Sequence, residues 1–323
     1  LSPLLSRGQR DNITIPPAEK LFTEGIALYY AVAGSAAVVI AVMLAVNGEL
    51  TAVCGETQTT FIIHVMGLAC CTLAALIKRE NPFRLARGVP FAIMLGGVIN
   101  YFTTLFNTMA VGRISVTAIL ALSLLGQAVT SLVIDCFGLF GMPRRRLGAL
   151  EFCGLAVTGA GIVLLLGGSG SAPFVPVAVS VLSGACCVCT RQVTAQLSER
   201  TSLLTGTWFS YFTGLIVSVA ALGAAGLLGE KVSFGAFDAR IWPYFGGALG
   251  ALAVFLQNIC VKRMSSVSMT LVMFAGQVFG GAVIDAVFYA EFSPRTLLGG
   301  ALAFAGLVLN ALSAGRKKKQ PPC

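Results

Sequence analysis

Apolar runs of about 20 residues, separated by short polar or charged segments, follow one another along nearly the whole chain. At about 1.5 Å per residue, a helix of that length crosses the hydrocarbon core of a bilayer, which is about 30 Å thick. The chain is therefore predicted to be an all-α integral membrane protein with ten transmembrane helices. The predicted spans are residues 26–46, 59–77, 89–110, 115–138, 147–167, 173–193, 203–228, 241–260, 265–289 and 296–314.

Composition agrees with this pattern. Of the 323 residues, 56% are hydrophobic and only 11% are charged, and the mean hydropathy is +0.87, far outside the range of soluble domains. Residues 1–24 are polar and lead into the first apolar run without a small-residue cleavage site. We therefore expect a cytoplasmic N-terminal tail rather than a signal peptide, and a basic C-terminal tail at residues 316–323.

The distribution of basic residues predicts the orientation of the helices. An even number of spans places both termini on one side, and that side holds 18 of the 22 lysines and arginines. Because cytoplasmic loops carry the positive excess, both termini are predicted to be cytoplasmic. The net charge of +9 is then a consequence of topology, and no nucleic-acid partner is expected.

The two halves of the chain resemble each other in sequence. A first unit, residues 25–168, and a second unit, residues 169–315, each hold five predicted helices. Because five is odd, the second unit is expected to insert upside down, and such inverted repeats build a substrate site near the bilayer midplane. At an offset of 150 residues the matched positions include Gly96–Gly97 with Gly246–Gly247, Arg113 with Arg263, Gln127 with Gln277, and Asp135 with Asp285.

Two matched glutamines lie at the centres of their spans. Gln127 is central in the fourth span and Gln277 in the ninth, so both are predicted to donate hydrogen bonds to, or accept them from, a substrate at the midplane. Ser123 lies one turn before Gln127 on the same helical face and joins the candidate site. The alternative is that these polar groups only tie neighbouring helices together.

Two matched aspartates lie about 12 Å from the glutamines along the same helices. Asp135 is expected toward the cytoplasm and Asp285 toward the outside. Since an ionised carboxylate at such depth needs water or a partner, both are hypothesised to bind a proton or cation that couples to transport. The alternative is structural, with each aspartate capping a helix or pairing with an arginine, such as Arg191 for Asp135.

Further polar residues fall inside predicted spans. Asn107 in the third span lies over Gln257 in the eighth at the 150-residue offset, which favours this pair for the cavity. His64 is the only histidine; pH sensing is chemically possible, and a hydrogen-bonded packing role is the alternative. The ten cysteines show no zinc-type pairing with histidine, so we expect free thiols, no metal and no cofactor.

Glycines recur in the fifth and tenth predicted spans. They occupy positions 154, 159 and 161 and positions 299, 300 and 306. Such residues let helices approach closely, so these two spans are predicted to form either a homodimer face or an internal contact.

The longest motif in the chain, Leu120 to Leu147 (LALSLLGQAVTSLVIDCFGLFGMPRRRL), resembles the YdcZ-like family of the drug/metabolite transporter superfamily. A glycine-punctuated span follows it, and a weaker copy recurs at Phe274 to Leu297. Residues Val46 to Leu50 (VNGEL) resemble the end of that family's first helix, so Asn47 joins the candidate substrate contacts. The resemblance covers nearly the whole chain as a fused pair of units, and implies transport of small molecules across a bacterial cytoplasmic membrane.

Enzymatic alternatives find little support in the sequence. The chain has no His-Glu-x-x-His motif and no Gly-x-x-x-x-Gly-Lys-Ser/Thr loop, and an inverted repeat would hold Asp135 and Asp285 too far apart to share a proton. We expect a secondary transporter, an exporter of a small organic solute working by alternating access in the lipid bilayer. Acidic cavity candidates favour cationic or neutral solutes. A membrane scaffold without transport remains the alternative.

Overall fold

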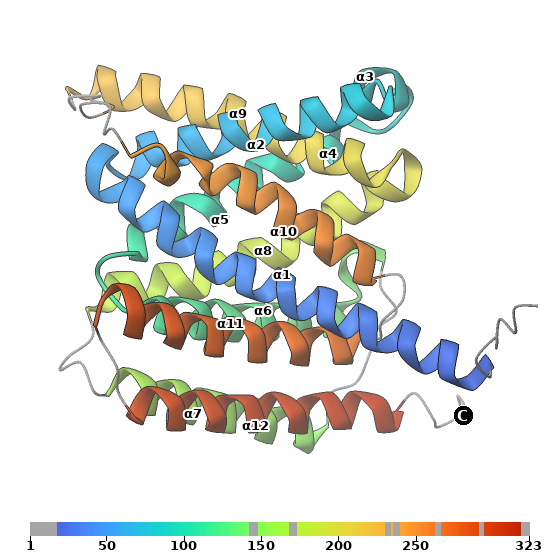
Figure 1. Ribbon diagram of the computed structural model, residues 1–323, viewed down its shortest axis with the longest axis vertical. Helices are drawn as coiled ribbons and strands as arrows, with labels where there is room; N and C mark the ends of the chain where they lie inside the picture. Colours follow the sequence, from blue (N-terminus) through green and yellow to red (C-terminus); the bar gives the residue numbers. More distant parts are fainter. Residues whose placement is uncertain are drawn as a thin grey trace, which may run out of the picture.

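The computed structural model of the protein describes residues 18–141, 148–167, 173–229, 234, 240–261, 266–290 and 294–317. Within these residues it contains twelve α-helices and two short 3-10 helices (Figure 1). They are α1 (Ala18–Cys54), α2 (Glu56–Lys78), α3 (Pro82–Leu85), α4 (Phe91–Met94), α5 (Gly96–Ala110), α6 (Val116–Phe137), η1 (Leu139–Gly141), α7 (Ala149–Leu166), α8 (Phe174–Arg200), α9 (Leu203–Leu227), η2 (Trp242–Phe245), α10 (Gly246–Val261), α11 (Ser266–Phe288) and α12 (Pro294–Lys317).

Each predicted span falls on a helix, and two of them are broken near the start. The third span is divided at Leu95 into α4 and α5, and the eighth begins as η2 and continues as α10. Both breaks directly precede a glycine pair, Gly96–Gly97 and Gly246–Gly247. Glycine costs about 1 kcal/mol relative to alanine inside a helix, so a break at these matched positions is favoured locally.

Helix length and composition can be compared with the ten predicted spans. Eight helical stretches in the described part of the chain are long and apolar enough to cross a bilayer. The two remaining predicted spans fall on α10, which has 16 residues, and on α12, where the described stretch Leu298–Leu309 is shorter than these criteria require. The protein is therefore multi-pass and all-helical in its described part, and eight of the ten predicted spans meet these criteria there.

The helices pack in a pattern that is unchanged when the two halves of the chain are exchanged. Helix α5 packs on α8 and α9 as α10 packs on α1 and α2, and α6 packs on α8 as α11 packs on α1. Helices α2 and α9 contact each other at one edge, and α7 and α12 do so at the opposite edge (Figure 1). The two five-helix units are therefore related by an approximate twofold rotation.

Matched glycines make the closest helix crossings possible. Gly97 on α5 lies against the backbone of Gly214 on α9, and Gly247 on α10 lies against the backbone of Gly67 on α2. A methyl group on Gly97 or Gly247 would overlap backbone atoms of the partner helix. The repeated glycines in the sequence thus mark places where two helices touch through their backbones.

The glycines of α7 and α12 are used within the chain. Gly161 lies against Gly299, and Gly306 lies against Gly154, with backbone atoms in contact between the two helices. This is the internal alternative to a homodimer face. A homodimer through the same glycines stays a prediction, and it would have to displace this contact between α7 and α12.

The start of α1 and the end of α12 lie at the same end of the bundle (Figure 1). That end also holds Lys78 and Arg79 at the end of α2, and Arg200 at the end of α8. We call it the basic end. The opposite end holds the N-terminus of α6 and the C-terminus of α11, which approach each other there.

Replacing Gly126 by alanine is expected to destabilise the crossing of α6 and α8. A methyl group at Gly126 would overlap the carbonyl group of Val181, and overpacking of this kind costs about 1–3 kcal/mol. Gly159→Ala is the matched control, because a methyl group there meets open space. Thermal unfolding of the purified protein should show a lower Tm for Gly126→Ala alone. Equal Tm values for the two variants would contradict the tight crossing.

Candidate functional site

A cavity of about 80 Å³ lies between helices of both repeats. Its walls come from α1, α5, α6, α8, α10 and α11. The polar lining residues are Thr103, Asn107, Ser123, Gln127, Ser183, Cys187, Arg191, Gln257 and Gln277, and the aliphatic ones are Ile40, Leu44, Ile119 and Leu120. Amide, hydroxyl and guanidinium groups therefore converge on one small space between the two repeats.

The structure brings five of the six predicted substrate contacts into this cavity. They are Asn107, Ser123, Gln127, Gln257 and Gln277. The two matched amide pairs thus meet in one place, although their members lie 150 positions apart in the sequence. Whether they contact a substrate remains a prediction, but the geometry that this prediction requires is present.

Asn47 lies elsewhere. Its side chain is 5% exposed and packs against Gly246 at the start of α10, and it is not among the residues that line the cavity. Its Oδ1 atom has no hydrogen-bond partner among the described residues. Thr194, the counterpart of Asn47, packs in the same way against Gly96. This placement favours a packing role at a helix crossing.

Arg191 is the cavity residue that sequence reasoning assigned differently. Its guanidinium donates to Oε1 of Gln127 at 2.9 Å and to Sγ of Cys187 at 3.4 Å. The proposed alternative pairing with Asp135 is not found among the described residues. The sequence does contain a sign of this role, because Arg191 lies inside the predicted span 173–193. A charge there is costly unless it has a function or a partner.

The bond from Arg191 fixes the orientation of the Gln127 amide. Because a guanidinium can only donate, the amide oxygen must face Arg191, and the amide NH₂ group is directed elsewhere as a donor. On the neighbouring wall, Ser183 donates to Oδ1 of Asn107 at 2.7 Å. The oxygens of both amides are therefore already bonded to protein donors, which leaves their NH₂ groups to face a ligand.

Asp285 caps helix α6 from the other repeat. Its carboxylate accepts hydrogen bonds from the backbone N–H groups of Val116 and Thr117, both at 2.9 Å, and from the Thr117 hydroxyl at 2.6 Å. The next N–H, that of Ala118, is satisfied by Ser115. A negative charge at a helix N-terminus is favourable, and Asp285 is only 3% exposed. This geometry matches the structural alternative for Asp285.

Asp135 lies in the last turn of α6, at the basic end, and is partly exposed. Neither Asp135 nor Asp285 lines the cavity. The charged residue of the described cavity walls is Arg191, and a charge preference set by carboxylates finds no support in these walls.

His64 is enclosed between α2, α5 and α9. It is fully buried, its Nδ1 lies 2.8 Å from the Thr60 carbonyl, and its ring contacts Tyr101 and Tyr211. Since a carbonyl only accepts, Nδ1 carries the hydrogen in this contact. His64 is not a cavity residue, so the packing alternative has the better geometric support, and pH sensing stays a prediction.

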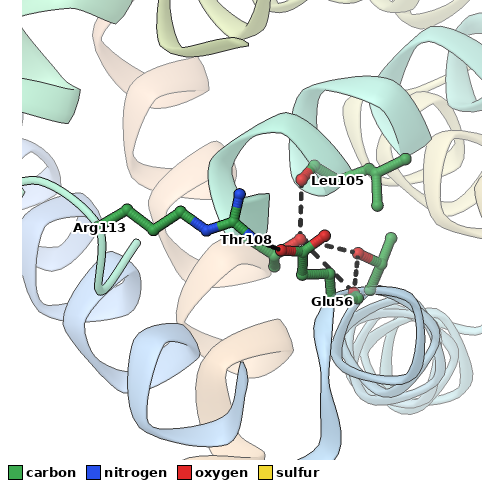
Figure 2. Close-up of polar contacts among 5 residues, drawn as sticks. Glu56, Leu105, Thr108 and Arg113 are labelled. Carbon is green, nitrogen blue, oxygen red and sulfur yellow. Dashed lines mark hydrogen bonds and ion pairs between the residues drawn. The ribbon is translucent and has the colours of Figure 1, made fainter. Parts of the chain in front are cut away.

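A polar cluster holds the opposite end of the bundle together (Figure 2). Arg113, in the turn before α6, forms an ion pair with Glu56 at the start of α2. Thr108 on α5 donates to the Leu105 carbonyl at 2.8 Å and lies 3.3 Å from the Thr60 hydroxyl. Together with the cap from Asp285, these contacts fix the start of α6 from two sides.

A wider cavity of about 470 Å³ lies between α3, α4 and α9. Its walls are almost entirely apolar, with Phe83, Phe91 and Phe212 among them, and Arg87 is the charged residue at its edge. Few of its lining groups could form hydrogen bonds with a polar solute. The smaller cavity is therefore the better candidate site, because convergent polar groups rather than volume give specificity.

Comparison with known proteins identifies the family. The sequence family described as "Putative inner membrane exporter, YdcZ" matches residues 28–164 and again residues 175–309. The chain belongs to the YdcZ family. The two matches show the fused two-unit form within the drug/metabolite transporter superfamily, and YdcZ family membership makes the chain a membrane protein of an exporter family.

The fold of this YdcZ family member has a counterpart among solved structures. One, titled "Crystal structure of protein", is 18% identical in sequence, with a TM-score of 0.61. The match covers 89% of this chain and 99% of that one. At this identity the likeness concerns the fold alone. No curated protein matches the chain in sequence.

Asp285→Asn is expected to lower the stability of the protein. The amide offers one acceptor oxygen in place of two and carries no charge toward the α6 N-terminus, so a cost of about 1–3 kcal/mol is expected. Thermal unfolding should give a lower Tm for Asp285→Asn. Thr117→Val removes one of the same hydrogen bonds, so the effects of the two changes should be less than additive in the double variant. Full additivity would argue against the cap.

Proposed function

We propose that the protein is a secondary transporter that exports a small organic solute across the bacterial cytoplasmic membrane by alternating access. Ten crossings arranged as two inverted five-helix repeats would place both termini, and the basic end, in the cytoplasm. One observation carries the proposal: matched amides from the two repeats, Gln127 with Gln277 and Asn107 with Gln257, line a single cavity. A site shared by two repeats is the arrangement that rocking halves require.

The burial of α6 supports a state that opens toward the basic end. Residues from Val116 to Leu122 are all buried, whereas Ser131 and Val133, beyond Gln127, are exposed. Arg191 at the cavity is exposed as well. Closure at the opposite end is consistent with the cap from Asp285 and the ion pair between Arg113 and Glu56. In this state a cytoplasmic solute would enter the cavity.

Coupling to protons is best assigned to Asp135 alone. Asp285 uses both carboxylate oxygens as acceptors, and protonation would forfeit bonds that hold the start of α6. Asp135 is partly exposed at the basic end, where it would meet cytoplasmic water.

The transport proposal is tested by comparing metabolites inside and outside cells that overproduce the protein. A solute should move to the medium with the wild type and return to the level of control cells with Gln127→Ala/Gln277→Ala. Gln58→Ala is the matched control, because Gln58 is an amide on α2 outside the cavity. If no solute shifts despite equal insertion of wild type in the membrane, a scaffold function would be favoured instead.

Proton coupling is tested with the solute that the first experiment identifies. In proteoliposomes, Asp135→Asn should remove the pH dependence of transport, because the amide does not titrate. Asp285→Asn should retain that dependence even if less protein folds. An unchanged pH profile in Asp135→Asn would refute the assignment.

A further inference from the structure

The cavity wall contributed by the second repeat carries a charged residue, Arg191, and the matching wall of the first repeat does not. At the offset of 147 residues that overlays α8 on α1, Arg191 lies over Leu44, and both residues line the cavity. The amide pairs obey the twofold relation between the repeats, but the guanidinium has no counterpart. A charged group that breaks the symmetry of a central site is positioned to orient an asymmetric ligand.

No carboxylate balances Arg191 within the described residues. Its polar contacts there are an amide oxygen and a thiol, and no aspartate or glutamate lines the cavity walls. Arg191 lies within the sixth predicted span, and charged residues inside transmembrane segments that face a cavity mark substrate or ion pathways. Arginine is also the side chain best shaped to hold a carboxylate through two parallel hydrogen bonds.

The neighbouring groups favour the same ligand charge. The oxygen of the Gln127 amide faces Arg191, so its NH₂ group is a donor, and the Asn107 oxygen accepts from Ser183. Deeper in the cavity the walls include Leu44 and Ile119, which are at most 2% exposed. The cavity thus combines hydrogen-bond donors beside a cation with a short aliphatic wall.

From these observations we propose that the exported solute is a small organic monoanion whose carboxylate is held by Arg191. Its short body lies among the buried aliphatic residues of α1 and α6. The cavity volume of about 80 Å³ limits the ligand to a small molecule. This inference rests on the proposed function for the direction of movement, but the anion site itself is independent of transport.

Export of a monoanion has an energetic consequence. A negative charge that leaves a cell with a negative interior moves down the membrane potential. Each 100 mV of potential then supports an outward concentration ratio of about 50-fold without any coupled ion. Arg191 neutralises this charge during its passage through the bilayer.

The test uses three probes that share one carbon skeleton and differ in charge: lactate, lactamide and 1-amino-2-propanol. Thermal unfolding of the full-length protein in detergent is measured with each probe at millimolar concentration. Lactate should raise the Tm of the wild type by a few degrees, and the neutral and cationic probes should not. Equal shifts with all three probes, or no shift with lactate, would overturn the proposal.

Variants assign the effect to Arg191. Arg191→Gln should abolish the shift with lactate, Arg191→Lys should retain part of it, and Arg200→Gln should behave as wild type. Arg200 is the control because it is an exposed arginine at the end of the same helix. The Tm without probe and elution as a single species establish that each variant is folded. A lactate shift that persists in folded Arg191→Gln would refute the site.

Two further arms separate the possible sources of failure. Inorganic phosphate replaces lactate in one, and a larger shift with phosphate would overturn a carboxylate in favour of a phosphate group. Transport of the solute found in cells is measured in the other. Binding of lactate through Arg191 without any solute transport would sustain the anion site and refute export. Unimpaired transport of a neutral or cationic solute by Arg191→Gln would sustain export and refute the monoanion.

Discussion

Polar side chains inside a bilayer must be satisfied by protein, by enclosed water or by a ligand, and the arrangement of this protein follows from that requirement. Asp285 accepts hydrogen bonds from the N–H groups at the start of α6. Glu56 forms an ion pair with Arg113. Threonine hydroxyls donate to backbone carbonyls of their own helices, as the Thr60 hydroxyl does to the Glu56 carbonyl. Several of the remaining polar groups gather in one cavity, where Arg191 and the NH₂ group of Gln127 are hydrogen-bond donors.

Backbone contacts at glycines determine where that cavity can form. Crossings at Gly97 and Gly247 bring α5 against α9 and α10 against α2. Because the same crossings occur in both repeats, Asn107 and Gln257 are carried to equivalent positions in the cavity wall. The twofold arrangement thus explains why amides so far apart in sequence converge, and it makes the unmatched Arg191 the feature that distinguishes one wall from the other.

Much of this arrangement could be predicted from the sequence, because apolar length and internal repetition are strong signals. The helices and the cavity amides Gln127 and Gln277 followed from them. The break at Leu95 could not, because the apolar pattern continues across it. The place of Arg191 in the cavity could not be predicted for a related reason: its counterpart, Leu44, is apolar, so an argument from matched polar positions passes over it. The sequence does not decide the role of Asp285, because its partners are backbone groups of a distant helix.

Alternating access requires that the cavity between the repeats is reached from one side of the membrane at a time. Cys187 lies in its wall, so a membrane-impermeant thiol reagent can report access in the unmodified protein. The reagent is applied to right-side-out and inside-out vesicles, and labelling is read for each cysteine by peptide mass spectrometry. Labelling of Cys187 from the cytoplasmic face alone is the predicted result. Labelling from the outer face alone, or from neither face while exposed cysteines react, would contradict the account.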